Sequence, residues 1–491
     1  MRRVFAKHAG AIPRGHAFRA AWVVCATCAL FGCKVGPNYV RPPVETPAAY
    51  KEAVPFKPAV PRDQEPRGNW WKVFKDPKLD ALLAQVEINN QTIKAAEARV
   101  REARALTQQA RAALFPLVSA SADATRSGSR GGNASIDNAG NVSIQGGGVR
   151  NNYNVSLDVS WEIDLWGRIR RTIEAGEATA QASVADLESA KLVAQAQLAE
   201  DYFLLRVQDA QIRLLNDTTE AYQRSLKLTQ NQYAVGVAGR ADVAQAETQL
   251  KSTQAQAIDA AIQRAQLEHA IAVLLGKPPG GFSVAVEAVP TEFPTIPPAV
   301  PSELLERRPD IAAAERRAAA ANAQIGVAQA AFFPSLSLSA TGGFQSSVLS
   351  QLFSLPSRYW SLGADLAQTI FDAGLRRAQT DQAIATYDEN VANYRQTVLS
   401  GFQNVEDNLA ALRILEQEAV VQDEAVKAAR ESLTITLNQY RAGTANYLAV
   451  VVVQAVALSN ERTALGILGQ RLTASVALIQ ALGGGWSAAS L

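Results

Sequence analysis

The sequence predicts a mixed α/β membrane protein in which β-barrel strands continue into a long α-helical coiled-coil barrel, with two internal repeats per chain. Three observations predict this fold class. A strand-like alternation changes within a few residues to a long helical pattern, the change occurs twice, and the two halves match at constant offsets. The change is clearest over residues 156–171, SLDVSWEIDLWGRIRR, where a two-sided strand ends and Gly167 precedes a basic helix start.

Residues 1–32 have the features of a bacterial signal peptide. Basic residues precede an apolar run over 20–32 that is too short to span a bilayer. The letters LFGC at its end resemble a lipobox, so Cys33 is expected to be the first mature residue and to carry diacylglycerol and an N-acyl lipid. An ordinary secretory signal is the alternative. Lys34 follows instead of the Asp that usually retains lipoproteins at the inner membrane, which implies an outer-membrane destination.

The composition argues against catalysis and against binding of nucleic acid. The formal net charge of +2 becomes −3 without residues 1–32, which hold five basic and no acidic side chains, and the remaining charges are dispersed. After the leader, His269 is the only histidine and Cys33 the only cysteine. These residues cannot assemble a His/Cys metal cluster or a Ser-His-Asp triad. We expect no enzyme activity, no metal and no cofactor other than the covalent lipid.

Two copies of one structural unit make up most of the chain. Phe115-Pro116 matches Phe333-Pro334 at an offset of 218 residues, whereas Gly167 matches Gly374 at an offset of 207. The difference of 11 residues is an insertion in a Gly/Ser/Asn-rich loop over 127–152 of the first unit. The two units are therefore expected to fold alike and to differ mainly in that loop.

The repeat and the punctuating Gly and Pro residues predict the element bounds. Residues 33–76 form a lipidated Pro-rich tether after the signal peptide. The first repeat, 77–276, holds a helix, a β-hairpin over 117–164, a long helix over 168–234 and a helix over 242–275. A linker over 277–301 leads to the second repeat, 302–482, with a helix, a β-hairpin over 335–370, a long helix over 375–441 and a helix over 446–481, before a tail over 483–491.

Four strands per chain cannot close a barrel. Because an open sheet edge in lipid leaves backbone groups unpaired, several chains must share one barrel, and three chains would supply twelve strands. The helix over 168–234 would be about 100 Å long at roughly 1.5 Å per residue and needs a partner helix. Apolar residues at spacings of three and four, such as Leu198, Tyr202, Tyr394 and Val398, predict a coiled-coil seam, with an ordinary bundle core as the alternative.

Several motifs of the chain resemble those of TolC-like outer membrane factors, specifically the NodT-like lipoprotein branch that serves RND-type efflux pumps. The matching letters are CKVGPNY from Cys33, WW at Trp70 with Asp76, IDLWGR from Ile163, ELLERRPDI from Glu303 and FFP from Phe332. The resemblance covers the whole mature chain. It implies a lipid-anchored homotrimer in the outer membrane of a Gram-negative bacterium, with a twelve-stranded barrel that continues into a twelve-helix periplasmic tunnel.

The same resemblance implies partners and a function. The partners are a periplasmic adaptor protein, an inner-membrane RND-type pump and the lipids of the outer membrane. The function is a passive exit duct for drugs or other small toxic compounds. The nearest alternative is the outer-membrane exit duct of a type I protein secretion system. An alternative of another class is a lipid-anchored coiled-coil scaffold without a pore.

The resemblance also implies roles for the two turns between paired helices, over 233–242 and 440–449. These turns are expected to be periplasmic tips. The residues expected to contact the adaptor are Gly236, Arg240, Gly443 and Thr444. The two glycines also have a purely structural explanation, since they suit a tight reversal between helices.

The gate is expected at the same tips. Asp242 and Tyr440 stand where the family links its two tips, but Ala445 occupies the position of the basic residue, so Arg441 or Arg240 is the candidate for that charge. Several family members place an Asp on the pore wall, where this chain has Leu448 and Val452. The sequence therefore predicts a hydrophobic constriction, which can gate by dewetting.

Overall fold

The structure is a computed structural model that describes residues 34–47, 49–51, 69–128, 133–136, 142–145, 148–290 and 307–485. Cys33 with its expected lipid, much of the tether and part of the linker lie outside the described residues. The chain forms two compact units. Unit 1 comprises Met1–Arg41, Ala103–Ala180 and Arg317–Asn390, and unit 2 comprises Pro42–Glu102, Gln181–Arg316 and Val391–Leu491.

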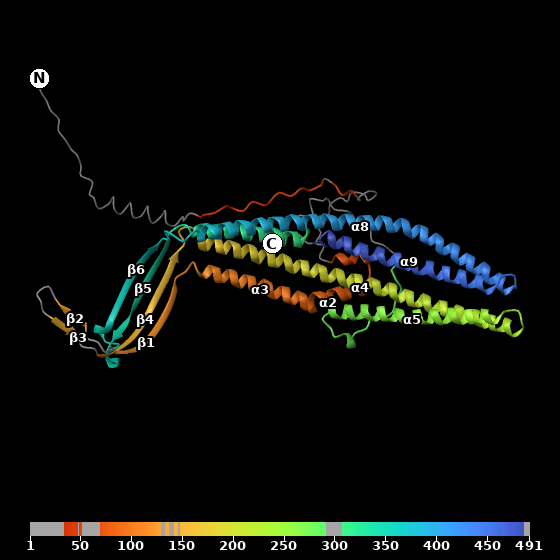
Figure 1. Ribbon diagram of the computed structural model, residues 1–491, viewed down its shortest axis with the longest axis horizontal. Coiled ribbons are helices and arrows are strands. Elements are labelled where there is room, and N and C mark those ends of the chain that lie inside the picture. The colour runs from red at the N-terminus through yellow and green to blue at the C-terminus, as the bar shows by residue number, and fades with distance from the viewer. Residues whose placement is uncertain are drawn as a thin grey trace, which may run out of the picture. The chain divides into compact units, whose positions relative to one another are not determined.

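Unit 1 contains a four-stranded antiparallel sheet in the order β1-β4-β5-β6 (Figure 1). Its strands are β1 (Leu117–Gly128), β4 (Val149–Ile163), β5 (Ser335–Ser346) and β6 (Arg358–Ala367). β1 pairs with β4 and β5 with β6, and β4 joins the two hairpins by pairing with β5. β1 and β6 form the edges of this sheet in the described chain.

The register places apolar side chains on one face of the sheet and polar side chains on the other. Leu157 lies opposite Ala120, whereas Asp158 lies opposite Thr341 and accepts a hydrogen bond from its hydroxyl at 2.8 Å. The apolar face remains uncovered in a single chain, since Trp360 is 71% exposed. A sheet with one uncovered apolar face and one polar face suits a barrel wall between lipid and a polar lumen.

The loop expected over 127–152 contains more structure than its composition suggested. β1 continues to Gly128 and β4 begins at Val149, and a separate antiparallel pair, β2 (Asn133–Ile136) and β3 (Val142–Gln145), lies between them. The letters NASI and VSIQ alternate in polarity. Alternation and turn residues are enough for a short hairpin, even where Gly and Ser dominate the composition.

The two long helices are α4 (Arg168–Ala234) and α8 (Leu375–Arg441), expected over 168–234 and 375–441. Each follows a glycine with a left-handed backbone, Gly167 at φ +80° and Gly374 at φ +90°. Residues with side chains avoid this conformation, so glycine allows the chain to turn from strand to helix within a few residues. The remaining long helices are α3 (Gln91–Ala112), α5 (Arg240–Leu274), α7 (Pro309–Ala330) and α9 (Tyr447–Ala481).

The first helix of repeat one is interrupted, which the apolar spacing did not indicate. α2 (Pro77–Asn89) ends at Asn90, whose backbone is extended at ψ 125°, and α3 follows. The Asn90 side chain accepts hydrogen bonds from the backbone N–H groups of Thr92 and Ile93 at 2.9 and 3.1 Å. An asparagine that caps the next helix in this way competes with continuation of the previous one.

The N-terminal residues 34–38 are held in unit 1 by a buried arginine. The guanidinium of Arg171 is 0% exposed and donates to the carbonyl oxygens of Val35 at 3.0 Å and Gly36 at 2.8 Å. Gly36 has φ +96°, and a Cβ added there would lie 2.4 Å from the Cα of Gly326 on α7. The backbone therefore approaches α7 more closely than any side chain would permit.

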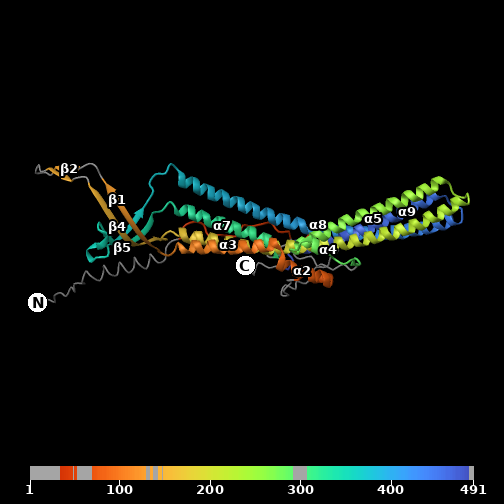
Figure 2. The same cartoon turned by 90° about the horizontal axis from the view of Figure 1, so that it is seen from below.

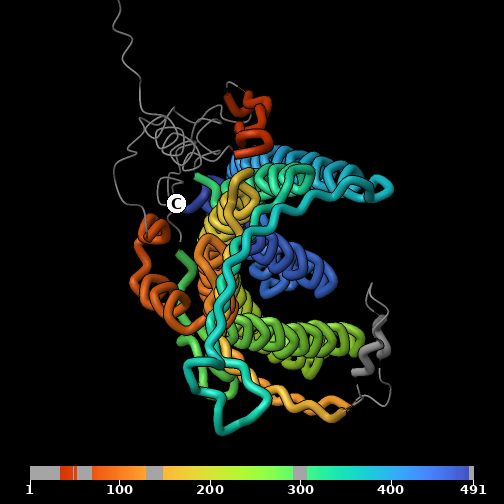
Figure 3. Tube along the Cα trace, turned by 90° about the vertical axis from the view of Figure 1, so that its left-hand side faces the viewer, coloured from red at the N-terminus to blue at the C-terminus, as the bar shows by residue number. Residues whose placement is uncertain are grey.

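Unit 2 contains two antiparallel helical pairs, α4 with α5 and α8 with α9. Figure 2 shows α5 returning along α4 after a tight turn. Figure 3, viewed along the helices, shows α9 between α8 and α5. The hydrogen bonds agree with this order, because Gln422 of α8 donates to Asn460 of α9 and Arg462 of α9 donates to Gln256 of α5.

The predicted seam residues lie in the core of unit 2. Leu198, Tyr202, Val398 and Leu409 are each 0% exposed. Among the described residues, α9 is the one helix that is long and apolar enough to cross a membrane, by length and composition only. Its buried side chains Leu472, Val476 and Ile479 pack into a cluster with Trp70, Trp71 and Leu198. The apolar character of α9 is thus used at least partly for helix packing.

A buried ionic cluster links α4, α5 and the start of the linker in unit 2. The side chains of Arg206 and Asp209 are each 1% exposed. Arg206 donates to the carbonyl oxygen of Ala285 at 2.6 Å and to the Tyr202 hydroxyl at 3.1 Å, and Asp209 accepts from Arg264 at 2.7 Å. Charges removed from water need such partners, so the cluster fixes the relative positions of the segments that supply them.

The same cluster reaches α2. The Tyr202 hydroxyl donates to the Asp76 carboxylate at 2.6 Å. The other oxygen of Asp76 accepts from the backbone N–H groups of Lys78 and Leu79 and so caps α2. Burial, and then this hydrogen bond to Asp76, raises the pKa of Tyr202. Tyr202 therefore remains a neutral donor between the capping carboxylate and Arg206.

Candidate functional site

The two turns between paired helices are closed by the same set of hydrogen bonds. In the first, Gly236 N–H donates to Tyr233 O at 3.0 Å and Val237 N–H to Gln232 O at 2.8 Å. In the second, Gly443 N–H donates to Tyr440 O at 3.0 Å and Thr444 N–H to Gln439 O at 2.9 Å. These pairs of bonds define the Schellman motif, and the glycines have φ +79° and φ +75°.

The helices that follow the turns are capped differently. In the first turn, the carboxylate of Asp242 reaches back and accepts from Gly239 N–H at 2.9 Å. In the second, Asn446 is the N-cap and its side chain accepts from Ala449 N–H at 3.0 Å. Ala449 occupies the repeat position of Asp242 and Asn446 that of Gly239, so the second helix is capped by the side chain of the N-cap residue itself. Asp242 thus has a structural function in addition to the expected gate function.

The predicted gate residues Asp242, Tyr440 and Arg441 are close in the fold, but no hydrogen bond between them is found in the described chain. The Tyr440 hydroxyl instead hydrogen-bonds the Thr229 hydroxyl at 3.0 Å. Arg441 donates to Asn438 at 3.2 Å. The negative charge of Asp242 still acts on Tyr440, since burial and that charge raise the pKa of the phenol. Thr229 was not identified from the sequence, because its function depends on α4 lying against α8.

Tyr440 and Tyr447 form the buried centre of the tip. Their ring centroids are 5.3 Å apart at an angle of 59°, and the rings are 5% and 2% exposed. Ala246 and Val450 complete the buried cluster, and Leu226 and Leu437 pack against it. All four long helices of unit 2 therefore meet at this point.

Removing the Tyr447 hydroxyl is expected to change the alkaline titration of the tip. Burial, followed by the neighbouring Tyr440, raises the pKa of Tyr447 to about 12 from 10.0. The folded form holds the Tyr447 proton more tightly than the unfolded form does, so burial of the neutral phenol contributes to the stability of the fold. This contribution is complete below pH 10 and is lost as the pH rises through about 12. The difference in tyrosinate absorbance between the native protein and Tyr447→Phe should therefore have its midpoint near 12.

The control for this titration is far-ultraviolet circular dichroism at each pH, which must show that the helices are intact. A difference absorbance with its midpoint near 10.0, the ordinary pKa of tyrosine, would show that Tyr447 is not buried in solution. A midpoint above it would support the packed tip.

An apolar stripe runs along α9 from the tip. Leu448, Val452 and Val456 are 54%, 54% and 47% exposed and recur every four residues, so they share one face of the helix. The first two were predicted as a constriction, and Val456 extends the same face. At the first tip, Val235 and Val237 are 74% and 69% exposed. Sequence reasoning overlooked these two valines because they lie in a turn, where no periodicity marks them.

The remaining predicted tip residues also lie at the surface. Gly236, Arg240, Gly443 and Thr444 are all exposed. In the part of the chain that the structure describes, the Arg240 side chain makes no hydrogen bond or ion pair, so it is available to a partner. The structure thus gathers the predicted contact residues on two adjacent turns at one end of unit 2.

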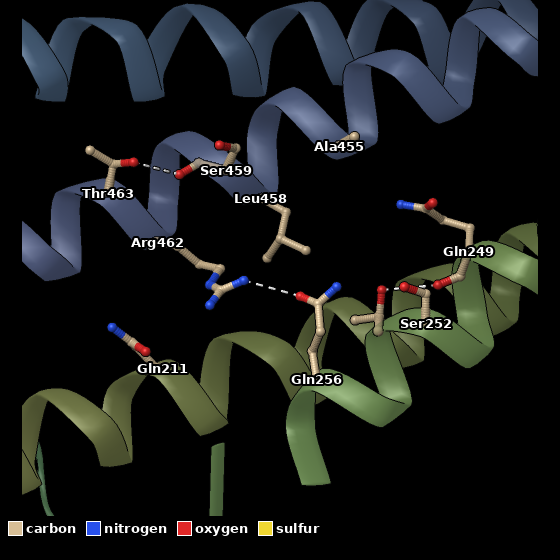
Figure 4. A pocket seen from close by; sticks show the side chains of 10 residues that line it. Gln211, Gln249, Ser252, Gln256, Ala455, Leu458, Ser459, Arg462 and Thr463 are labelled. Atoms are coloured by element: carbon tan, nitrogen blue, oxygen red, sulfur yellow. Dashed lines mark hydrogen bonds between the residues drawn. The ribbon is translucent and has the colours of Figure 1, made fainter. Parts of the chain in front are cut away.

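A polar groove of about 540 Å³ runs between α5 and α9 (Figure 4). Arg462 reaches across it and donates to Gln256 at 3.1 Å, with Gln211 of α4 nearby. The other lining residues are Gln249, Ser252, Thr253, Ala455, Leu458, Ser459 and Thr463. Uncharged amides and hydroxyls dominate this set, in which Arg462 is the one charged residue. Among the described residues, no group of three or more His, Cys, Asp or Glu could hold a metal ion.

Comparison with known proteins gives these features a family context. Residues 82–277 and 300–484 each match the family described as "Outer membrane efflux protein". The chain belongs to this outer membrane efflux protein family. The two matches correspond to the two repeats, and a family of efflux channels is not enzymatic. The channel is 33% identical over 461 residues to the probable efflux pump outer membrane protein TtgC of Pseudomonas putida, with 93% of each chain covered.

A second relative and two solved structures agree with this assignment. The pyoverdine export outer membrane protein OpmQ of Pseudomonas aeruginosa is 32% identical, with 85% of this chain and 87% of the relative covered. The outer-membrane channel OprN superimposes with a TM-score of 0.83 at 31% identity, covering 92% of this chain and all of that chain. The open-state MtrE channel of Neisseria gonorrhoeae superimposes with a TM-score of 0.78 at 28% identity, covering 93% of this chain and 99% of that chain. The predicted fold of long helices and four antiparallel strands per chain is confirmed.

Proposed function

We propose that three copies of this channel form one twelve-stranded barrel in the outer membrane and one helical tunnel in the periplasm. The duct is passive and conducts small toxic compounds, which an RND-type inner-membrane pump delivers through a periplasmic adaptor. The sheet supports this proposal most directly. It has one uncovered apolar face and two edge strands, and an open edge is not tolerated in lipid, so other copies must complete it.

Heat-modifiable trimers and conductance in planar bilayers test this function. The purified protein should migrate as a trimer before heating and as a monomer after heating, and it should conduct ions when inserted into a bilayer. A protein that stays monomeric, soluble and nonconducting would exclude the duct and favour a coiled-coil scaffold. Copurification of a crosslinked adaptor and pump from the native host would then identify the transported class.

The relatives guide the proposal about substrates and partners. The names of four of them refer to antibiotic, toluene and solvent efflux and to pyoverdine export, and none of these four names refers to protein secretion. We therefore favour small compounds over secreted proteins as cargo. The polar groove of α5 and α9 contains few charged groups, which is consistent with a duct whose selectivity resides in the pump.

Lipid attachment at Cys33 is part of the proposal. Supporting it, Lys34 forms an ion pair with Glu174 at 2.5 Å, and residues 34–38 are held by Arg171. The segment that would follow an acylated Cys33 is therefore fixed to unit 1, which contains the sheet. One acylated cysteine anchors a protein but does not make it span, so the sheet remains the spanning element.

The tips are proposed to contain both the adaptor contact and the gate. Gly236, Arg240, Gly443 and Thr444 supply exposed backbone and one available cation for the adaptor, and Val235 and Val237 add apolar surface. Asp242, Tyr440 and Arg441 lie at the same end. Of the three, Tyr440 joins the two helical pairs, through its hydrogen bond to Thr229 of α4. Leu448 and Val452, joined by Val456, form the hydrophobic constriction.

Polar substitution of the constriction is expected to raise conductance. Leu448→Ser with Val452→Ser places hydroxyls where apolar side chains exclude water, so the closed tip should remain hydrated and the single-channel conductance in planar bilayers should increase. The matched control is Ile258→Ser with Ile262→Ser on α5, which has the same spacing and exposures of 74% and 56% but lies away from the turn. Equal conductance of both double variants and the native channel would contradict a hydrophobic gate.

A further inference from the structure

The charged residues of the sheet in unit 1 are divided unevenly between its two faces. Residues that lie opposite one another share a face, so the register assigns every residue of the four strands to one side. Arg126 on β1 and Arg358 on β6 share the apolar face with Val118, Leu157 and Leu366. On the polar face lie the acidic residues of these strands, Asp123, Asp158, Glu162 and Asp365. The two arginines therefore have no carboxylate from these strands beside them on the apolar face.

Both arginines lie at the loop end of the apolar face. Arg126 is eight residues after Val118, and Arg358 is eight residues before Leu366, and these two apolar residues are near the helical ends of β1 and β6. Eight residues extend about 27 Å along a strand, or about 21 Å through a membrane at a tilt of about 40°, which is most of an apolar band about 25 Å high. The arginines are thus placed where the apolar band ends and lipid headgroups begin.

Neither arginine is engaged within the part of the chain that the structure describes. The side chains of Arg126 and Arg358 are exposed, and no described residue forms a hydrogen bond or an ion pair with them. A guanidinium group has five N–H donors and no acceptor. Arginine on the lipid-facing side of a barrel costs little near the membrane interface, although it is costly at the midplane. Each arginine therefore presents unused donors at a level where it can be tolerated.

The connection between β5 and β6, residues 347–357, adds an apolar surface at the same level. Phe353 in this connection packs edge-to-face on Phe344 of the apolar face, with ring centroids 5.6 Å apart. This contact places the connection beside the lipid-facing side of the sheet. Leu349 and Leu355 are 62% and 84% exposed, and residues 347–357 include no charged side chain. An uncharged segment with exposed leucines suits contact with acyl chains just below the headgroups.

We propose that Arg126 and Arg358 bind the phosphate groups of lipid A, the anchor of lipopolysaccharide, and that the 347–357 connection packs on its acyl chains. The helices are proposed to lie in the periplasm, so the loop end of the sheet faces the outer leaflet, where lipid A carries the phosphate. The guanidinium fork matches phosphate oxygens in a bidentate way.

The position of the two arginines on the edges of the sheet suits a lipid with two phosphates. Arg126 is on β1 and Arg358 is on β6, the two edge strands in the described chain. Where the edges of two copies meet in the proposed trimer, one arginine of each kind approaches the same seam, and lipid A has two phosphates on one acylated disaccharide. This inference rests on the proposed trimer and names the lipid that its outer rim binds.

A titration with lipid A tests the site in the full-length protein, by native mass spectrometry in a nonionic detergent with EDTA to remove bridging divalent cations. The double variant Arg126→Gln with Arg358→Gln should bind lipid A about tenfold more weakly than the native protein, because charge-assisted hydrogen bonds to phosphate are lost. The matched control is Arg150→Gln. Arg150 is exposed at the same end of β4 but lies on the polar face, so its replacement should leave the affinity unchanged.

Dephosphorylated lipid A separates the charge contacts from the apolar packing. The native protein should bind it as weakly as the double variant binds intact lipid A. Equal affinity of the native protein for both lipids, or of the native protein and the double variant for lipid A, would overturn the phosphate site and show that the arginines only extend to water. The same spectra report the trimer. Trimers whose affinity does not depend on the arginines leave the proposed duct standing, whereas the absence of trimers removes the duct and this site with it.

Spin labelling measures the position of the connection. Leu355→Cys and the control Arg150→Cys each add one thiol, and Cys33, the only other cysteine after the leader, is expected to be acylated. In liposomes that contain lipid A, the label at position 355 should be more accessible to oxygen than to a water-soluble nickel chelate, and the label at position 150 should show the reverse. Equal accessibilities at the two positions would contradict packing of the connection on acyl chains.

Discussion

Arg206→Met is expected to lower the stability of the helical unit by about 3–5 kcal/mol, because it removes the positive centre of a buried ionic cluster. The carbonyl oxygen of Ala285 and the Tyr202 hydroxyl lose a hydrogen bond from Arg206. Asp209 keeps its ion pair with Arg264 but loses the positive charge of Arg206, which lies 3.6 Å away. The thermal midpoint, followed by circular dichroism and by the conversion of trimer to monomer on gels, should fall by many degrees.

The matched control lies on the same helix. Arg224 pairs with Glu220 at 3.8 Å, and both side chains are more than 70% exposed, at 73% and 74%. Exposed ion pairs contribute about 0–1 kcal/mol, so Arg224→Met should leave the midpoint nearly unchanged. If Arg206→Met and Arg224→Met have the same thermal midpoint, the cluster around Arg206 is hydrated in solution and does not hold the linker to α4.

Gly36→Ala is expected to release the N-terminal segment from unit 1. The added Cβ would lie 2.4 Å from the backbone of Gly326, which cannot move away as a flexible side chain could. The substitution also forces a side chain into a left-handed backbone at φ +96°, and overpacking of this kind costs about 1–3 kcal/mol or more. Trypsin should then cleave after Lys34 on the order of tenfold faster, since about 1.4 kcal/mol corresponds to a factor of ten.

Gly236→Ala controls for a general effect of replacing a glycine with a left-handed backbone. Gly236 has φ +79° but nothing lies within 4 Å of an added Cβ, so this variant includes the backbone strain without the clash. Cleavage after Lys34, measured by mass spectrometry of the released N-terminus, should remain at the native rate in Gly236→Ala. Gly36→Ala cleaved no faster than the native protein would show that the close contact with Gly326 does not hold the segment.

Much of the fold was predictable from local sequence. The long helices expected over 168–234 and 375–441 coincide with α4 and α8, because Gly167 and Gly374 mark their starts and the Gly236 and Gly443 turns their ends. The four strands were predictable from alternation. The break at Asn90 and the β2–β3 hairpin were not, because each depends on a short polar pattern that also occurs in loops.

The candidate site was predictable in position but only partly in its contacts. The tip turns follow from glycines at matching repeat positions, and Leu448 and Val452 follow from their place on α9. The hydrogen bond from Tyr440 to Thr229 spans 211 residues of sequence, so no local pattern indicates it. Val235 and Val237 were overlooked for a different reason, since exposure of an apolar side chain in a turn depends on what the rest of the chain leaves uncovered.

The sequence by itself determined the long helices, the four strands of the large sheet and their twofold repetition, because periodicity and turn glycines act within a few residues along the chain. Only the tertiary structure decided that β4 lies beside β5, that Arg206 is buried with Asp209 and Arg264, and that Gly36 touches Gly326. Those contacts join segments far apart in sequence. Their free energy arises from buried apolar surface and shared hydrogen bonds, which exist only after the segments meet.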